Sequence, residues 1–119
     1  MKDNPVKEKS MAFALRVVDL AKRLEGEKRE YVLSKQILRS GTAIGALIRE
    51  AEHAESRNDF IHKMSIGLKE ANETKYWLEL LVQGEYINNE SFESIRADSE
   101  ELIKLLAAIV KTTRVKKTA

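Results

Sequence analysis

The sequence predicts an all-α protein, an up-down-up-down antiparallel four-helix bundle. Two observations indicate helices: apolar residues recur at spacings of three and four in four separate stretches, and no stretch alternates apolar and polar residues as a strand would. A third observation gives the topology. The connections between these stretches are short, and short connections between long helices force neighbouring helices to run antiparallel.

The first predicted helix covers residues 11–25, and its apolar stripe consists of Phe13, Val17, Leu20 and Leu24. Gly26 follows and suits the left-handed backbone conformation found just past a helix end. We expect this helix 1 to be shorter than the other three. Residues 1–9 before it and residues 115–119 at the other end of the chain are expected to be frayed tails.

The second predicted helix runs from Ser34, whose side chain can cap it, to about residue 55. Its apolar stripe consists of Ile37, Gly41, Ile44, Ile48 and Ala51. Gly41 and Gly45 lie inside this helix, where a glycine costs about 1 kcal/mol relative to alanine. We therefore expect another helix to approach closely at these two positions.

The third helix is predicted from residue 58 or 59 to Gly84, and the fourth from residue 88 or 89 through Arg114. Asparagine and aspartate at both starts favour a helix N-terminus, because their side chains accept from free backbone N–H groups. The third stripe consists of Phe60, Met64, Gly67, Ala71, Leu78 and Leu81, and the fourth of Phe92, Ile95, Leu102, Leu106 and Ile109.

The composition fits a single four-helix-bundle domain over residues 1–119. The chain has no cysteine, which excludes a disulfide framework, a thiolate zinc site and a cysteine nucleophile. No apolar run approaches the roughly 20 residues of a membrane span, and the first ten residues are too polar for a secretory signal. We expect a cytoplasmic protein that does not bind membranes.

Few residues could carry catalysis. The two histidines, His53 and His62, each follow a carboxylate by three residues, Glu50 and Asp59. Glu-x-x-His pairs occur in di-iron bundles, but these histidines lie near the tip of a helix hairpin rather than in mid-bundle. Glu50 and Glu73 could act as the paired carboxylates of a cofactor-free enzyme, although glutamates on helices are usually ion-pair partners. We predict no enzyme: no catalytic residue, no metal and no cofactor.

Basic charge is separated from acidic charge, although the formal net charge is only +2. One outward row of the second helix carries Lys35, Arg39, Arg49 and His53 at spacings of 4, 10 and 4 residues, without an acid. The small residues Thr42 and Ala46 lie between them and would let a phosphate backbone come close. Five acidic residues collect in the first half of the fourth helix, whereas its end is basic.

This pattern predicts nucleic-acid binding through phosphates. The predicted contacts are Lys35, Arg39, Arg49, Lys111, Arg114, Lys116 and Lys117. The alternative is a solvated face whose cations pair with Glu50, Glu52 or a neighbouring subunit.

The third helix carries a second apolar row, Ile66, Trp77 and Leu80, rotated away from its first. Either the core-facing stripe is wide, or this row is a subunit interface, which exposed aromatic area favours. We predict the interface, and with it a closed homo-oligomer.

Three blocks of sequence resemble a known family: RSGTAIGALIREA over residues 39–51, SRNDF over 56–60 and ETKYWL over 73–78. In order and spacing they are similar to the bacterial four-helix-bundle family named after the 23S rRNA intervening sequence protein, also labelled S23 ribosomal protein. The resemblance covers about residues 13–113. Two residues depart from the family pattern: Leu47 stands where the family usually has Asn, and Gly67 where it usually has Ala.

The resemblance implies a bundle that assembles into a ring-shaped homopentamer. Relatives include the accessory variability protein of diversity-generating retroelements, a basic pentamer that binds nucleic acid and a reverse transcriptase. The resemblance also implies that Ser56 and Asp59 form a cap and turn, and that Glu73 makes an ion pair with Arg39 or Arg49. The family's motif positions are occupied by Arg39, Ser40, Ile44, Glu50, Ser56, Asp59, Phe60, Glu73, Tyr76 and Trp77.

Together these observations predict a non-catalytic homo-oligomer, a pentamer by resemblance, that binds structured RNA or a ribonucleoprotein partner. Five copies would carry roughly +10 and present the basic row repeatedly, which raises avidity for a polyanion. The alternative is a protein-interaction scaffold that docks a partner enzyme, such as a nucleic-acid enzyme, without binding nucleic acid itself. If the basic row of the second helix is buried between subunits, or neutralised by Glu50 and Glu52, the scaffold hypothesis is favoured.

Overall fold

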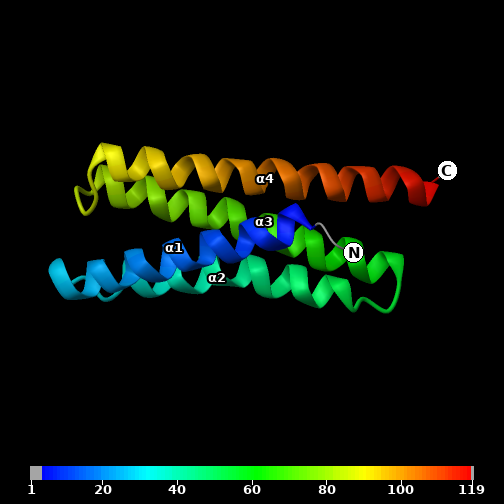
Figure 1. The fold of residues 1–119 in the computed structure, drawn as a ribbon, viewed down its shortest axis with the longest axis horizontal. Coiled ribbons are helices and arrows are strands. Elements are labelled where there is room, and N and C mark those ends of the chain that lie inside the picture. Colours follow the sequence, from blue (N-terminus) through cyan, green and yellow to red (C-terminus); the bar gives the residue numbers. More distant parts are fainter. Residues whose placement is uncertain (1–3, 119) are drawn as a thin grey trace.

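The computed structural model describes residues 4–118, and of residues 116–118 it describes only the helical backbone. Four α-helices make up the described chain: α1 (Pro5–Glu27), α2 (Leu33–Glu52), α3 (Arg57–Gln83) and α4 (Asn89–Thr118). They run alternately up and down in an elongated bundle of 50 × 25 × 21 Å (Figure 1). The predicted all-α, up-down-up-down bundle is confirmed.

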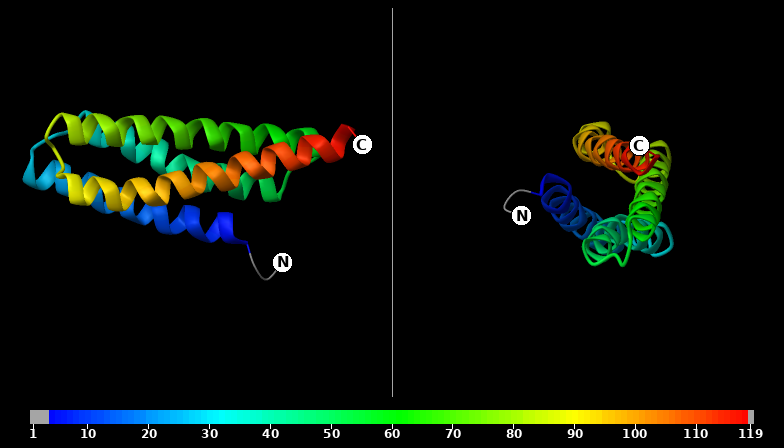
Figure 2. Two further views of the ribbon diagram at one scale, coloured as in Figure 1. Left: turned by 90° about the horizontal axis from the view of Figure 1, so that it is seen from above. Right: turned by 90° about the vertical axis from the view of Figure 1, so that its right-hand side faces the viewer.

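Each helix packs against two others: α1 against α2, α2 against α3, α3 against α4, and α4 against α1. Within the described residues the backbones of the diagonal pairs, α1 with α3 and α2 with α4, do not come within 8 Å of each other at any pair of Cα atoms. The pairing of α1 with α4 is the sparsest, and Figure 2 shows the bundle partly open where these two helices diverge. Outward side chains of α2 and α4 therefore belong to different faces of the molecule.

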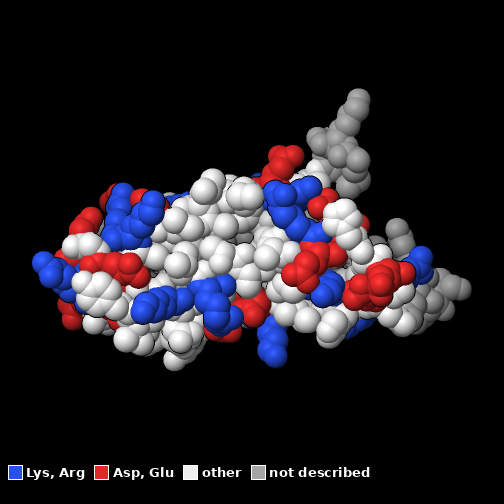
Figure 3. Space-filling view, turned by 90° about the horizontal axis from the view of Figure 1, so that it is seen from below, with Lys and Arg blue, Asp and Glu red and all other residues white. Residues whose placement is uncertain are grey.

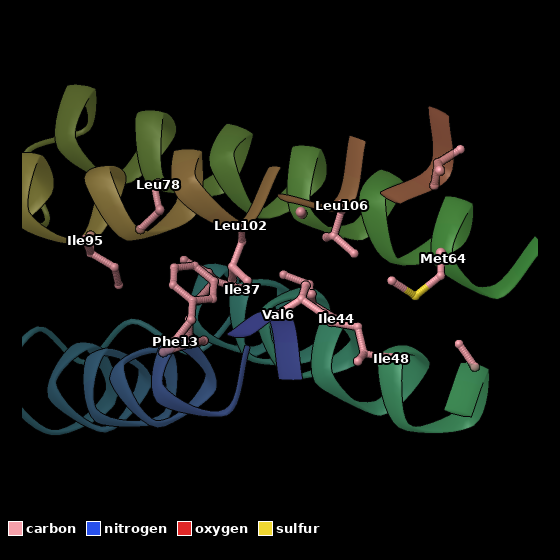
Figure 4. Packing of buried hydrophobic residues seen from close by; sticks show 14 of the residues in the cluster. Val6, Phe13, Ile37, Ile44, Ile48, Met64, Leu78, Ile95, Leu102 and Leu106 are labelled. Atoms are coloured by element: carbon pink, nitrogen blue, oxygen red, sulfur yellow. The ribbon is translucent and has the colours of Figure 1, made fainter. Parts of the chain in front are cut away.

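The core is built from the predicted apolar stripes. Its fully buried side chains include Phe13, Ile37, Ile44, Leu78, Leu102 and Leu106, which point toward the space between the helices (Figure 4). The stripe residues Leu20, Phe60, Phe92 and Ile109 are half-buried at its edge. One buried polar contact crosses between α2 and α3, where Thr74 Oγ1 donates to Ser40 Oγ (2.9 Å). Removing these stripes from water is the main driving force that holds the four helices together.

α1 begins at Pro5 rather than at residue 11. The Asn4 side chain caps it by accepting from the Lys7 N–H (3.2 Å), and Pro5 takes the first helical turn, where its missing N–H costs nothing. Val6 and Ser10 extend the stripe at the same spacing and are buried. α1 therefore has 23 residues and α2 has 20, so the predicted short first helix is wrong. Residues 5–9, predicted as part of a tail, are helical.

The end of α1 is also later than predicted, because Gly26 does not terminate it. The helix continues to Glu27, and the left-handed backbone occurs at Arg29 (φ 55°). Gly84 does follow the last residue of α3, as predicted, but there the left-handed residue is Glu85 (φ 67°). In both turns, N–H groups beyond the helix bond back to its last carbonyls, and these bonds set the turn position instead of the glycine.

Glu30, and not Ser34, caps α2. Its carboxylate accepts from the N–H groups of Val32, Leu33 and Ser34 at 3.1, 2.9 and 2.8 Å. Burial disfavours the charged form, but these three donors outweigh it and lower the pKa of Glu30. Ser34 is buried, and its hydroxyl donates to the Glu25 carboxylate of α1 (3.1 Å).

The turn between α2 and α3 is built by a reciprocal pair of caps. α2 ends at Glu52 rather than at residue 55, and Ser56 caps α3 by accepting from the Asp59 N–H (3.0 Å). Asp59 in turn accepts from the Glu55 N–H (3.1 Å). The cap and turn that the resemblance implied for Ser56 and Asp59 are confirmed.

The start of α4 agrees with the prediction, and its end does not. The Asn88 side chain accepts from the Ser91 N–H (2.8 Å) directly before the helix. α4 then continues to Thr118, so residues 115–118 are helical where a frayed tail was predicted, and Ala119 lies outside the described residues.

The interior glycines of α2 lie against α1. A Cβ placed on Gly41 would lie 2.8 Å from the Val17 methyl groups, and one on Gly45 would lie 3.4 Å from Ser10 Oγ. The predicted close approach of another helix is confirmed at both positions. It is tightest at Gly41, where the absent side chain makes room for Val17.

Candidate nucleic-acid interface

The predicted row on α2 is exposed, but acids from α3 reach into it. Lys35, Arg39 and Arg49 are exposed on the outward side of α2. Arg39 spans to α3, where Nη1 lies 3.3 Å from Glu70 Oε1 and Nη2 is bonded to Glu73 Oε2. Lys35 and Arg49 make no ion pair within the described residues. The side of the molecule seen in Figure 3 carries charges of both signs at its two ends, and the surface between them is uncharged except for mainly basic side chains along its lower edge.

Arg39 is held in a fixed polar network. Its hydrogen bond to Glu73 raises the pKa of the Arg39 guanidinium. Trp77 Nε1 donates to Glu73 Oε2 (3.1 Å), and this bond, followed by the contact with Arg39, lowers the pKa of Glu73 against its partial burial. The ion pair between Glu73 and Arg39 that the resemblance implied is confirmed. Because two carboxylates surround Arg39, it adds little net positive charge to the row.

The two acids considered as partners of the row bind other cations. Glu50 pairs with Lys63 of α3 (2.9 Å), and Glu52 pairs with Lys7 of α1 (3.0 Å). These contacts raise the pKa of Lys63 and lower the pKa of Glu52. Among the described side chains, direct ion pairing within the row therefore occurs only at Arg39, with acids of α3, while Glu52 also attracts Arg49 and His53 electrostatically.

α4 divides into a neutralised half and an uncompensated half. Four acids of its first half are paired: Glu93 with Arg96 (2.6 Å), Asp98 with Arg16 (2.6 Å), Glu100 with Lys75 (3.4 Å) and Glu101 with Lys9 (3.2 Å). Beyond them come Lys104, Lys111 and Arg114, and neither lysine makes an ion pair within the described residues. Arg114 Nη2 lies 3.4 Å from Ser65 Oγ of α3, a neutral partner. Positive charge therefore accumulates along the second half of α4.

We refer to Lys104, Lys111 and Arg114 as the α4 row. All three are exposed, and spacings of seven and three residues put them on one side of the helix. Ala107 and Ala108 lie between them and are also exposed. Lys104 was not among the predicted contacts. Its spacing of seven residues from Lys111, about two helical turns, would have indicated that both lie on the same side of the helix.

The seven predicted phosphate contacts do not form one surface. Lys35, Arg39 and Arg49 lie on α2, whereas Lys111 and Arg114 lie on α4, which is diagonally opposite α2 in the bundle. The side chains of Lys116 and Lys117 lie outside the described residues. One chain therefore presents two separate basic groups, of which the α4 row is the less neutralised.

The second apolar row of α3 is partly covered by its own chain. Trp77 packs against the core and Ile66 is half-buried. Leu80 is 36% exposed, and the neighbouring Tyr76 is 54% exposed, with its ring centroid 5.1 Å from that of Trp77 in an edge-to-face arrangement. The row thus widens the core-facing stripe and also leaves an apolar, aromatic edge on the surface.

The residues considered for catalysis are exposed or bound to cations. His53 directly follows α2, His62 lies on α3, and both are exposed. Glu50 and Glu73 hold Lys63 and Arg39. Among residues 4–118, no three side chains of metal-binding type are grouped as a cation site. No helix in this part of the chain combines the length and apolarity needed to cross a membrane.

Two open grooves flank the sparse contact between α1 and α4. One, of about 1030 Å³, lies beside the connection between α3 and α4, and the other, of about 860 Å³, lies at the opposite end over Ile48, Met64 and Ile109. The ion pairs of Arg16 and Lys9 bridge the two helices between them. Neither groove is lined by a histidine, so the grooves do not assemble the residues considered for catalysis.

The fold and its charges define a class of protein: a small antiparallel four-helix bundle with an exposed basic helix face. The family model of the 23S rRNA-intervening sequence protein matches residues 2–108. The chain belongs to this family, and the resemblance in the sequence blocks is confirmed.

A solved structure is similar to this chain over most of its length. It is the crystal structure of a protein of unknown function from the S23 ribosomal protein family of Bacteroides thetaiotaomicron. The two are 63% identical with a TM-score of 0.88, and the match covers 89% of this chain and 98% of that one. No curated protein matches.

Proposed function

We propose that this protein is a non-catalytic homo-oligomer that binds RNA through phosphate contacts. The observation that carries the proposal is the uncompensated charge of the α4 row, beside a first half of α4 in which four of the five acids are paired. Exposed cations without acidic partners are available to phosphates, whereas paired ones must first break an ion pair. Ala107 and Ala108 lie between the cations and have small side chains, so the backbone of a nucleic acid can approach closely.

Assembly strengthens the proposal. A chain of net charge +2 is a weak polyanion binder alone, but a ring multiplies each basic group. The number five follows from the resemblance, and five copies carry roughly +10. The family description names an intervening sequence of 23S rRNA, which favours RNA as the polyanion.

Salt-dependent binding tests this function. Fluorescence anisotropy with a labelled RNA should show an affinity that falls log-linearly with salt, because each neutralised phosphate releases condensed counterions. Lys104→Ala and Lys111→Ala should weaken binding to all sequences and make the slope shallower by roughly one unit per lost contact. Lys22→Ala is the matched control, since Lys22 is also exposed and without an ion pair in the described residues but lies on α1.

Two results would reject the proposal. One is the absence of RNA binding at about 50 mM salt, where electrostatic contacts are strong. The other is an equal effect of Lys22→Ala and Lys111→Ala, which would show that only the total charge matters.

A scaffold that docks a partner protein is the second candidate. Two observations favour it: the α2 row is partly neutralised at Arg39, and the edge formed by Tyr76 and Leu80 is apolar and exposed. Tyrosine, tryptophan and arginine are the residues that most often dominate binding at protein interfaces. In this case the ring should form and RNA binding should be absent.

A further inference from the structure

The α4 row has a shape that suits one form of nucleic acid. We propose that it binds the backbone of double-helical segments in preference to single strands. This inference rests on the proposed function and names the ligand of the same surface. Three features of the molecule support it: the rigidity of the row, the surface between its cations and the position of the exposed aromatic rings.

The row is straight and rigid because it lies on one uninterrupted helix. α4 extends from Asn89 to Thr118 without a break (Figure 1). At 1.5 Å per residue, Lys104 and Lys111 lie roughly 10 Å apart along the axis, and Arg114 follows after about 4.5 Å. The whole row spans about 15 Å, the rise of roughly four phosphates along one strand of a duplex. Cations fixed on a straight line match phosphates whose positions are also fixed.

Single-strand binding depends on a second element that the row lacks. Proteins that hold single strands combine a basic groove with aromatic side chains on which the bases stack. Between the cations of the α4 row lie Ala107 and Ala108, which have no ring. Duplex contacts need no ring, because the stacked bases stay inside the helix and the phosphates face outward.

The exposed aromatic rings lie elsewhere. Tyr31 precedes α2, and Tyr76 lies on α3 with its ring against Trp77. Trp77 in turn donates to Glu73, which holds Arg39 of α2, so this aromatic pair adjoins α2 rather than the α4 row. On the α3 side, the row is instead bordered by the small Ser65, 3.4 Å from Arg114.

A competition experiment tests the inference. A labelled 20-base-pair RNA duplex is bound to the full-length protein and displaced by unlabelled duplex or by a poly-uridine strand of the same number of phosphates. The duplex should compete at roughly tenfold lower concentration, because it carries about twice the axial charge density and presents it rigidly. Lys111→Ala should reduce this preference, and Lys22→Ala should leave it unchanged.

The outcomes separate the two proposals. A poly-uridine strand that competes as well as the duplex, or better, would overturn the duplex preference while the RNA-binding function stands. An unchanged preference in Lys111→Ala would overturn the assignment of that preference to the α4 row. Failure of both ligands to bind would overturn the proposed function itself.

Discussion

Gly41 and Gly45, one turn apart on α2, meet α1 at different distances. A Cβ at position 41 would overlap the Val17 methyl groups at 2.8 Å, whereas one at position 45 would make ordinary contact with Ser10. Gly41→Ala should therefore lower the free energy of unfolding by about 1–2 kcal/mol, because overpacking outweighs the helix propensity gained. Gly45→Ala should be neutral or stabilising by up to about 1 kcal/mol. Urea unfolding followed by circular dichroism measures both.

The pair serves as its own control, since both substitutions add one methyl group to the same helix. If Gly41→Ala proved as stable as Gly45→Ala, the contact between α1 and α2 would be loose enough to move aside. The tight approach described above would then be wrong.

The two residues that depart from the family pattern are neighbours in space. A Cβ on Gly67 of α3 would lie 3.8 Å from Leu47 Cβ and 3.9 Å from Leu106 Cδ2. The apolar side chain of Leu47 on α2 therefore lies beside Gly67 on α3, which has no side chain. Any polar contact that an asparagine makes here is replaced by apolar packing between α2 and α3.

At the scale of an element, the start of α2 depends on one carboxylate. Glu30 bonds three N–H groups of the first turn, so Glu30→Gln should cost about 1 kcal/mol at pH 7, the usual worth of a helix cap. The pKa of Glu30 is lowered on folding, so its contribution is fully present above its ordinary value of about 4.5. The contribution is lost as pH falls through the lower, folded pKa. The difference between the two proteins should therefore shrink toward pH 3.

Glu27→Gln is the matched control for this cap. Glu27 lies at the exposed end of α1 and makes no ion pair or side-chain hydrogen bond in the described residues, so its substitution should change stability by less than about 0.5 kcal/mol. A Glu30→Gln protein whose deficit stayed constant between pH 7 and pH 3 would show that the carboxylate charge is not what caps α2.

At the scale of the whole molecule, the exposed edge of α3 predicts self-association. Light scattering at micromolar concentration should give a multiple of the 13.6 kDa chain mass, five by resemblance. Leu80→Glu should dissociate the assembly and keep the helical circular dichroism signal, because Leu80 is 36% exposed and lies outside the core. Trp77 is a poorer site for this test, since it packs against the core and bonds Glu73.

Leu15→Glu provides the comparison, because Leu15 is 62% exposed on α1, away from the predicted interface of Ile66, Trp77 and Leu80. It should leave the mass unchanged. A wild-type protein that scatters as a monomer would refute the assembly. Dissociation by Leu15→Glu alone would move the interface to α1.

The sequence by itself determined the four helices, the residues of each that face the core, and the need for a close helix approach at Gly41 and Gly45. These follow from local rules, since a helix repeats every 3.6 residues and a glycine in its interior needs compensation. The motif blocks also determined the family. The start of α4 was predicted correctly because one side chain, that of Asn88, caps the helix. The cap of α2 was missed because a residue before the helix, Glu30, accepts from several N–H groups of the first turn.

Only the tertiary structure decided which charges remain free. From the sequence, Arg39 stands in an acid-free row, yet α3 brings Glu70 and Glu73 against it. Conversely, four of the five acids of α4 are paired with cations of α1 and α3 as well as of α4 itself, and this leaves Lys104 and Lys111 uncompensated. Ion pairs between helices depend on which faces the fold places within about 4 Å, and the strength of an interaction between charges depends on that distance. Periodicity along one helix contains no information about that distance.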